Sequence, residues 1–169
     1  TKQKNQKKKY RCMQKVDTYS QKQNEKFMRA ALKQAQKAYE NGEVPIGAVV
    51  VLDGKILSRG RNDRNKKQIA THHAEVIAIE KACKKLNSWR LENCVLYVTL
   101  EPCAMCLGAC FNARIKQVFF GAYDPKGGVC GSVANLAEEN QLNHFLTATG
   151  GVLQEECGEI LKSFFKSKR

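Results

Sequence analysis

Segments with strand character alternate with segments of helical periodicity along this chain, and this alternation limits its possible folds more than any other feature. Residues 46–52 (IGAVVVL) and 94–100 (CVLYVTL) are apolar runs typical of strands buried on both faces. Further strands are expected at 55–60, 117–122 and 145–149, and helices at 24–40, 73–87, 102–113, 133–139 and 153–169. Strands alternating with helices favour an α/β fold in which helices cover both faces of a largely parallel sheet.

Three local patterns indicate where these elements begin and turn. Asn24 is suited to cap the first helix. Asp53-Gly54 predicts a two-residue hairpin that adds one antiparallel edge strand, because both residues tolerate positive φ. Pro102 is expected to open the third helix, since proline at a first helical position loses no hydrogen bond.

The positive charge lies at the two ends of the chain. The net charge is +13, yet residues 23–161 carry 17 basic and 15 acidic residues. Residues 1–22 hold eight basic residues and one acid without apolar periodicity, which predicts a disordered basic arm followed by a single domain over 23–169. Basic ends favour a polyanionic partner such as nucleic acid, although a solvated tail would look the same.

Composition excludes several other classes of protein. No apolar run approaches the roughly 20 residues of a membrane span, and the lysine-rich amino end has no apolar segment behind it. We therefore expect a cytoplasmic protein with no membrane segment. Its eight cysteines are then expected to be reduced, so that burial or metal binding is favoured over disulfides.

One pair of motifs carries chemistry. His73 stands at the expected start of one helix, and Cys103 and Cys106 form a Cys-x-x-Cys at the start of another. If the two helix starts lie side by side, one imidazole and two thiolates meet and leave a fourth tetrahedral position open, as at catalytic zinc sites. Glu75 lies in the same first turn as His73 and can act there as general acid and base on metal-bound water.

Each part of this pattern has a simpler explanation when taken alone. A Cys-x-x-Cys can be a redox pair or half of a structural zinc site. Glu75 alone could be an acid that favours a helix amino end. The combination His-x-Glu with Pro-Cys-x-x-Cys, however, is typical of zinc deaminases that act on cytosine or adenine.

The chain resembles the bacterial tRNA-specific adenosine deaminases of the cytidine/deoxycytidylate deaminase superfamily over residues 24–169. The matching segments are 27–40, 43–49, 60–62, 71–78, 97–105, 121–126, 131–132 and 164–166. The resemblance implies a three-layer α/β/α cytidine-deaminase-like fold with a central mixed five-stranded sheet. It also implies a homodimer that converts the wobble adenosine of an arginine tRNA anticodon to inosine.

The resemblance further implies roles for individual residues. It makes His73, Cys103 and Cys106 ligands of one Zn²⁺ per chain, and Glu75 the proton shuttle. The residues matched to contacts with the tRNA anticodon stem-loop are Asn62, Val44, Pro45, Ile46, Asp124, Lys126, Phe164, Phe165 and Lys166.

Several of these RNA contacts also have purely structural explanations. Phe164 and Phe165 could pack in the core, Asp124 could cap the Pro125 turn, and Lys126 could be a solvated loop charge. Two alternative functions remain open at this stage. A deaminase of free nucleobases or nucleosides, of the guanine or cytosine type, would share the zinc ligands and Glu75. A zinc-stabilised RNA-binding module would need no Glu75.

Overall fold

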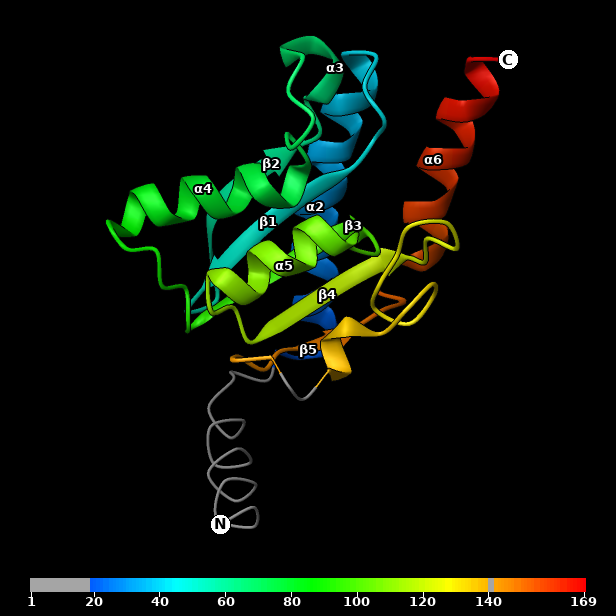
Figure 1. The fold of residues 1–169 in the computed structure, drawn as a ribbon. Coiled ribbons are helices and arrows are strands. Elements are labelled where there is room, and N and C mark those ends of the chain that lie inside the picture. The colour runs from blue at the N-terminus through cyan, green and yellow to red at the C-terminus, as the bar shows by residue number, and fades with distance from the viewer. Residues whose placement is uncertain (1–18, 140–141) are drawn as a thin grey trace, which may run out of the picture.

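A five-stranded sheet lies between two layers of helices in the computed structural model, which describes residues 19–139 and 142–169 (Figure 1). The helices are α2 (Gln21–Glu40), α3 (Arg64–Lys67), α4 (Ala74–Leu86), α5 (Ala104–Asn112) and α6 (Gln154–Ser167), with a 3-10 turn η1 (Leu136–Glu138). The strands are β1 (Gly47–Leu52), β2 (Lys55–Arg61), β3 (Cys94–Leu100), β4 (Gln117–Ala122) and β5 (Thr147–Thr149). Within the described residues, none of the helices combines the length and the apolar composition of a membrane span.

The sheet is mixed, as the resemblance implied. Its strand order is β2-β1-β3-β4-β5. β1 pairs antiparallel with both β2 and β3, whereas β3 pairs parallel with β4 and β4 with β5. The expectation of a largely parallel sheet with one antiparallel edge is therefore wrong, because β1 runs opposite to β3 as well as to β2.

Helices cover both faces of the sheet, which confirms the three-layer α/β/α arrangement (Figure 1). Side chains alternate along the central strands, so that Val50 packs towards α4 and α5 while Val49 packs towards α2 and α6. In β3, Leu96 and Tyr97 alternate in the same way. Apolar residues on both faces explain why the central strands are continuous apolar runs.

The predicted hairpin is confirmed, but two predicted helix starts are wrong. Asp53 and Gly54 have φ of 48° and 71° and join β1 to β2. Ser20 caps α2 in a capping box with Gln23, and Asn24 lies inside the helix, where it accepts a hydrogen bond from the Tyr97 hydroxyl. Pro102 precedes α5, because Cys103 takes the cap position.

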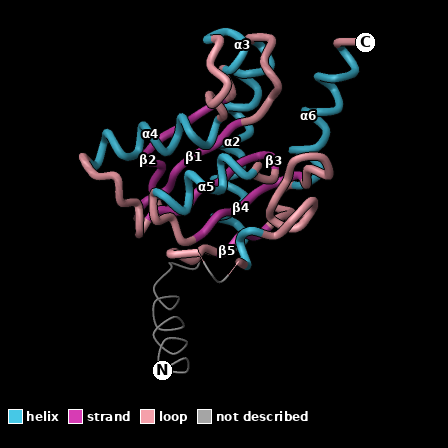
Figure 2. Tube along the Cα trace, viewed as in Figure 1, coloured by secondary structure: helices cyan, strands magenta, loops and turns pink. Residues whose placement is uncertain are grey.

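Smaller differences concern the loops, which Figure 2 distinguishes from helices and strands. A short helix, α3, lies in the region expected to be a polar loop. The segment expected to be helical at 133–139 forms only the turn η1, and the last strand covers three residues. Of the predicted basic arm, residues 1–18 lie outside the described residues, and Gln21 and Lys22 belong to α2.

A close contact between β2 and α4 positions the amino end of α4. A Cβ atom at Gly60 would lie 2.1 Å from the carbonyl oxygen of Ala74, so any larger residue would push α4 off the sheet. Because Ala74 is the first residue of α4, Gly60 sets the distance at which the neighbouring His73 and Glu75 stand from the sheet.

Candidate metal centre and pocket

The three predicted metal ligands come together where the amino ends of α4 and α5 meet. His73 is the cap residue of α4 and Cys103 that of α5, and neither side chain caps its own helix. The Nδ1 atom of His73 lies 3.4 Å from Sγ of Cys106 and 3.8 Å from Sγ of Cys103. All three ligand atoms lie within 4.8 Å of one another, so this cluster could hold a metal ion.

The chemistry of these donors fits zinc. One imidazole nitrogen and two sulfurs are the donors that zinc prefers, and a set of three leaves one tetrahedral position for water or substrate. Hydrogen bonds from Cys106 and His73 lower the pKa of the Cys103 thiol to about 4. Metal binding requires the thiolate form, and Cys103 therefore favours it at neutral pH.

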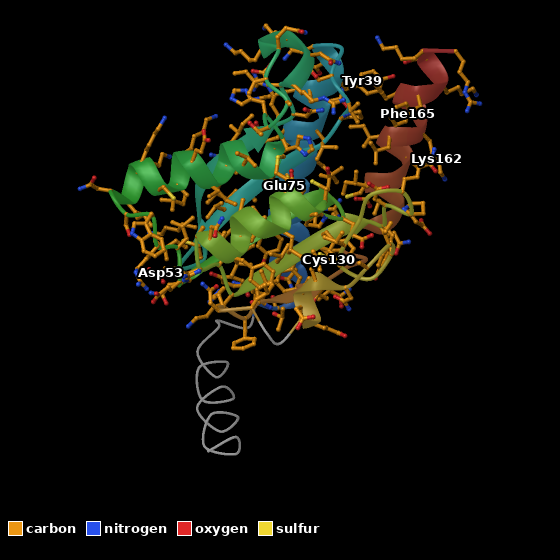
Figure 3. The ribbon with its side chains drawn as sticks, in the orientation of Figure 1. Tyr39, Asp53, Glu75, Cys130, Lys162 and Phe165 are labelled. Atoms are coloured by element: carbon orange, nitrogen blue, oxygen red, sulfur yellow. The ribbon has the colours of Figure 1, made fainter. Side chains whose placement is uncertain are left out.

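Glu75 stands beside this cluster in a buried position. Its side chain is on α4, and only 4% of the residue is exposed (Figure 3). Burial raises the pKa of the Glu75 carboxyl to about 7, because burial disfavours the charged form. A carboxyl with this pKa can both accept and donate a proton near neutral pH.

A pocket of about 850 Å³ opens over the cluster at the carboxyl ends of β3 and β4. In parallel parts of α/β sheets, this edge is the usual place for ligands. The predicted site residues that line the pocket are His73, Cys103, Glu75, Asn62, Val44, Ile46, Asp124, Lys126 and Phe165. The structure thus brings together residues from segments that are far apart in sequence.

Four predicted site residues do not line the pocket. Cys106 is buried beneath it, and Pro45 is buried between Val44 and Ile46. Phe164 is 6% exposed and packs edge-on against Tyr39 of α2. Its position is therefore that of a core residue, as the structural explanation for Phe164 predicted. Lys166 is exposed on α6 outside the pocket lining.

The pocket also has walls that the sequence analysis did not assign. Arg64 and Tyr123 both line it. Tyr123 could have been found, because it directly follows a predicted strand at its carboxyl end. Arg64 gave no such indication, since it is one of several basic residues in a polar loop.

Two buried glutamates hold the opposite walls of the pocket in place. Both oxygens of Glu101 accept hydrogen bonds, from the backbone N–H groups of Asp124, Cys130 and Ser132 and from the Ser132 hydroxyl. Burial alone would raise the pKa of Glu101, but these four hydrogen bonds hold it below its ordinary value. This buried carboxylate therefore fixes the loop that carries Asp124 and Lys126.

Glu43 does the same for the other wall. It is 2% exposed, and its carboxylate accepts hydrogen bonds from the backbone N–H groups of Asn65 (3.2 Å) and Lys66 (2.6 Å). These groups lie at the amino end of α3, where helix N–H groups have no partner within the helix. Glu43 thereby anchors the segment that carries Asn62 and Arg64.

Comparison with known proteins agrees with the fold. Residues 22–169 match the family model of the MafB19-like deaminases. The chain is 51% identical over 147 residues to the tRNA-specific adenosine deaminase of Bacillus subtilis (strain 168), covering 87% of this chain and 91% of that protein.

Two solved structures are also similar. One comes from studies of A-to-I editing by tRNA:A34 deaminases at the wobble position of transfer RNA; it has a TM-score of 0.77 and 43% identity, over 80% of this chain and 98% of that one. The other is a guanine deaminase from Bacillus subtilis, with a TM-score of 0.56 and 44% identity, over 59% of this chain and 64% of that one.

The chain belongs to the MafB19-like deaminases and to the tRNA-specific adenosine deaminases. This membership confirms the resemblance inferred from the sequence motifs and the fold that it implied.

Replacement of a single ligand tests the metal cluster. We expect His73→Ala and Cys103→Ala to lose bound metal, because two remaining donors hold an ion poorly. Cys110→Ala is the control, since this cysteine is buried in α5 but is not part of the cluster. Elemental analysis of the purified variants measures the outcome, and full metal content in His73→Ala and Cys103→Ala would contradict the assignment.

Replacement of Glu101 tests the loop anchor. Glu101→Gln replaces one of the two accepting carboxylate oxygens with an NH2 group that can only donate, so at least one buried backbone N–H loses its acceptor. We therefore expect the free energy of unfolding to fall by about 1–3 kcal/mol. Urea denaturation measures the change. Glu138→Gln, an exposed position in η1, is the control and should leave stability within about 0.5 kcal/mol of the parent.

Proposed function

We propose that this protein deaminates adenosine to inosine at the wobble position of a tRNA anticodon, with an arginine tRNA as its substrate. In this reaction water replaces the amino group at C6 of adenine, and ammonia leaves. The observation that carries the proposal is the pocket itself, which joins a His-Cys-Cys cluster and a buried glutamate to a rim of basic and aromatic side chains. Its relatives by sequence and structure are named for the same reaction.

Zinc is the metal that we propose for the cluster, held by His73, Cys103 and Cys106, one ion per chain. When bound, it supplies a Lewis acid at the base of the pocket. The donor set supports zinc because hard oxygen-preferring ions such as magnesium avoid thiolates.

Glu75 is the proposed proton carrier. Its buried carboxylate takes a proton from the attacking water and delivers it to the departing amino group. A pKa near 7 suits both halves of this transfer, because the group neither holds nor releases its proton too strongly.

Asn62 is the proposed contact to the edge of the adenine base. Its Nδ2 donates to the carbonyl of Val44 (3.3 Å), and its Oδ1 accepts from the backbone N–H of Arg64 (3.3 Å). These two bonds fix the amide plane at the pocket wall. One N–H and one oxygen lone pair remain for the base, while Val44 and Ile46 supply an apolar wall next to it.

The rim is the proposed site for the nucleotides beside the target. An adenine stacked in an anticodon loop must turn out to reach the pocket, and its neighbours can then stack on exposed rings. Phe165 is 51% exposed and lines the pocket with Lys126, Lys168 and Arg169. Asp124 accepts a hydrogen bond from the Lys126 N–H (3.0 Å), so it also shapes the turn that presents this lysine.

We further propose that the protein is a homodimer and acts in the cytoplasm, where tRNA is its substrate. Ile69 and Met105 support a dimer, because they expose large apolar side chains next to the helix starts that carry the metal ligands. Sedimentation equilibrium of the purified protein tests this part of the proposal, and a monomer at micromolar concentration would contradict it.

Deamination of a free nucleobase or nucleoside is the alternative function. It is tested because the chain is also similar to a guanine deaminase. The test is incubation with an arginine tRNA that carries adenosine at the wobble position, with inosine read by sequencing. Free adenosine, cytidine and guanine are incubated in parallel. Inosine in the tRNA supports the proposal, and turnover of a free nucleobase or nucleoside without inosine in the tRNA would overturn it.

Glu75→Ala separates proton transfer from metal binding. We expect the variant to keep its metal, since the three ligands are unchanged, and to lose editing by about 10²–10⁴-fold, the usual value of general acid–base catalysis. Single-turnover editing and elemental analysis of the same sample measure both effects. Near-normal turnover would show that Glu75 is not the proton carrier.

Phe165→Ala tests stacking at the rim. Stacking of one base is worth about 1–3 kcal/mol, so we expect the affinity for tRNA to fall by roughly 10- to 100-fold at unchanged metal content. Phe165→Tyr keeps a ring at this position and serves as the control. Equal affinity of Phe165→Ala and the parent protein would exclude stacking on this side chain.

A further inference from the structure

A row of basic side chains runs along the outer face of α2, away from the pocket. Its members are Lys22, Lys26, Arg29, Lys33 and Lys37, and all are exposed. Their spacing of three or four residues places them within an arc of about 80° on the helix, and they extend over roughly 22 Å of its length. The opposite face, with Phe27 and Ala31, packs on the sheet.

Most of this charge is available to a partner. Arg29 lies near Glu25 (3.9 Å) and Glu156 (3.3 Å). Among the described residues, by contrast, no carboxylate lies within 4 Å of the ammonium groups of the four lysines. A partner with negative charge would therefore not have to displace an acidic side chain from these lysines.

The row borders a hollow that continues onto the edge of the sheet. A cavity of about 1090 Å³ is lined by the basic residues of α2 and, from β2, by Ile56 and Arg59. Arg59 also lines a second hollow of about 420 Å³, with Lys81, Lys84 and Lys85 of α4. We call this surface the α2–β2 flank. Its basic members whose side chains form no ion pair with the described part of the chain are Lys22, Lys26, Lys33, Lys37, Arg59 and Lys84.

The shape and charge of the flank fit an extended polyanion rather than a small ligand. Its positive groups are spread along a line of about 22 Å, whereas a single phosphate or carboxylate would need them to converge. One nucleic-acid strand carries a phosphate about every 3.4 Å along a helix, so some six phosphates match this length. Glu25 is the one acidic residue among those that line the two hollows.

The flank and the pocket are connected through the chain. α2 ends at Glu40, just before the segment with Val44 and Ile46 that lines the pocket, and β2 ends at Arg61, just before Asn62 (Figure 1). An RNA whose loop enters the pocket can therefore continue along α2 without leaving the surface of one protein molecule.

We propose that the α2–β2 flank binds the RNA phosphate backbone outside the loop that enters the pocket, without reading its sequence. The identity of the bound RNA as the substrate tRNA rests on the proposed function. The binding itself does not, because the flank contains no residue of the pocket.

Charge reversal on α2 in the full chain tests this proposal. The variant is Lys26→Glu/Lys33→Glu, and the probe is a fluorescent RNA hairpin without adenosine in its loop, so that no editing can occur. We expect affinity at 0.1 M salt to fall by at least about tenfold. The slope of log K against log salt should decrease by about 1.4–1.8, because each phosphate contact contributes about 0.7–0.9.

Two control variants separate position from net charge. Lys26→Arg/Lys33→Arg keeps the charge and should bind as the parent does. Arg90→Glu/Lys116→Glu makes the same change of net charge in segments that precede β3 and β4, at the opposite end of these strands from the pocket, and should change affinity less than threefold. A loss with the second control equal to that with the α2 variant would overturn the proposal, as would an unchanged salt slope in the α2 variant.

The remaining outcomes distinguish this proposal from the others. Phosphatidylserine vesicles replace the hairpin in a parallel assay, and a loss of vesicle binding with unchanged RNA binding would overturn the proposal in favour of a membrane surface. If the arginine tRNA is not edited but the α2 variant loses hairpin binding, the flank proposal is supported and the proposed function is overturned. If the tRNA is edited and hairpin binding is unchanged, the flank proposal alone is overturned.

Discussion

The site depends on the meeting of two helix amino ends. α4 and α5 each begin with a residue whose side chain leaves its own helix uncapped, and these two side chains, His73 and Cys103, face each other instead. Helix amino ends carry partial positive charge, which favours thiolate over thiol. The meeting of the two helix amino ends therefore brings the donor atoms together and also favours the thiolate form that a metal ion needs. Gly60 is part of this arrangement, because it lets α4 approach the sheet closely.

The pocket walls depend on buried carboxylates whose oxygens accept hydrogen bonds. Glu43 and Glu101 lie in two different loops near the His-Cys-Cys cluster. Each accepts hydrogen bonds from backbone N–H groups of a wall segment that lies more than 20 residues further along the chain. A carboxylate with several such partners is well satisfied, whereas a neutral replacement leaves buried donors without acceptors. Loops of irregular structure are held in this way with a rigidity that their own backbone does not provide.

The chemical groups of the site were easier to predict from the sequence than the packing of the segments around them. The meeting of His73, Cys103 and Cys106 was predictable, because metal ligation demands particular residue types at a particular spacing. The buried position of Glu75 beside them followed from its place in the same first helical turn as His73. The antiparallel pairing of β1 with β3 was not predictable. The relative direction of two strands depends on how distant segments pair, and it does not change the hydrophobic periodicity of either strand. Glu43 and Glu101 escaped notice for a related reason: a buried acid is recognisable only once its backbone partners are in place. Phe164 and Phe165 are adjacent aromatic residues, yet one is buried and the other exposed, since successive helix positions point about 100° apart.

The edge of the sheet shows a further consequence of where the lysines of α4 lie. β2 is an outer strand, and such strands offer unpaired carbonyl groups to any other extended chain. Lys85 donates to the carbonyl of Leu57 (2.7 Å) and Lys81 to that of Arg59 (3.2 Å), so two acceptors on this edge are already occupied. Another strand approaching β2 would have to break both contacts and place its backbone against two ammonium groups. The two lysines thus protect the protein from edge-to-edge aggregation.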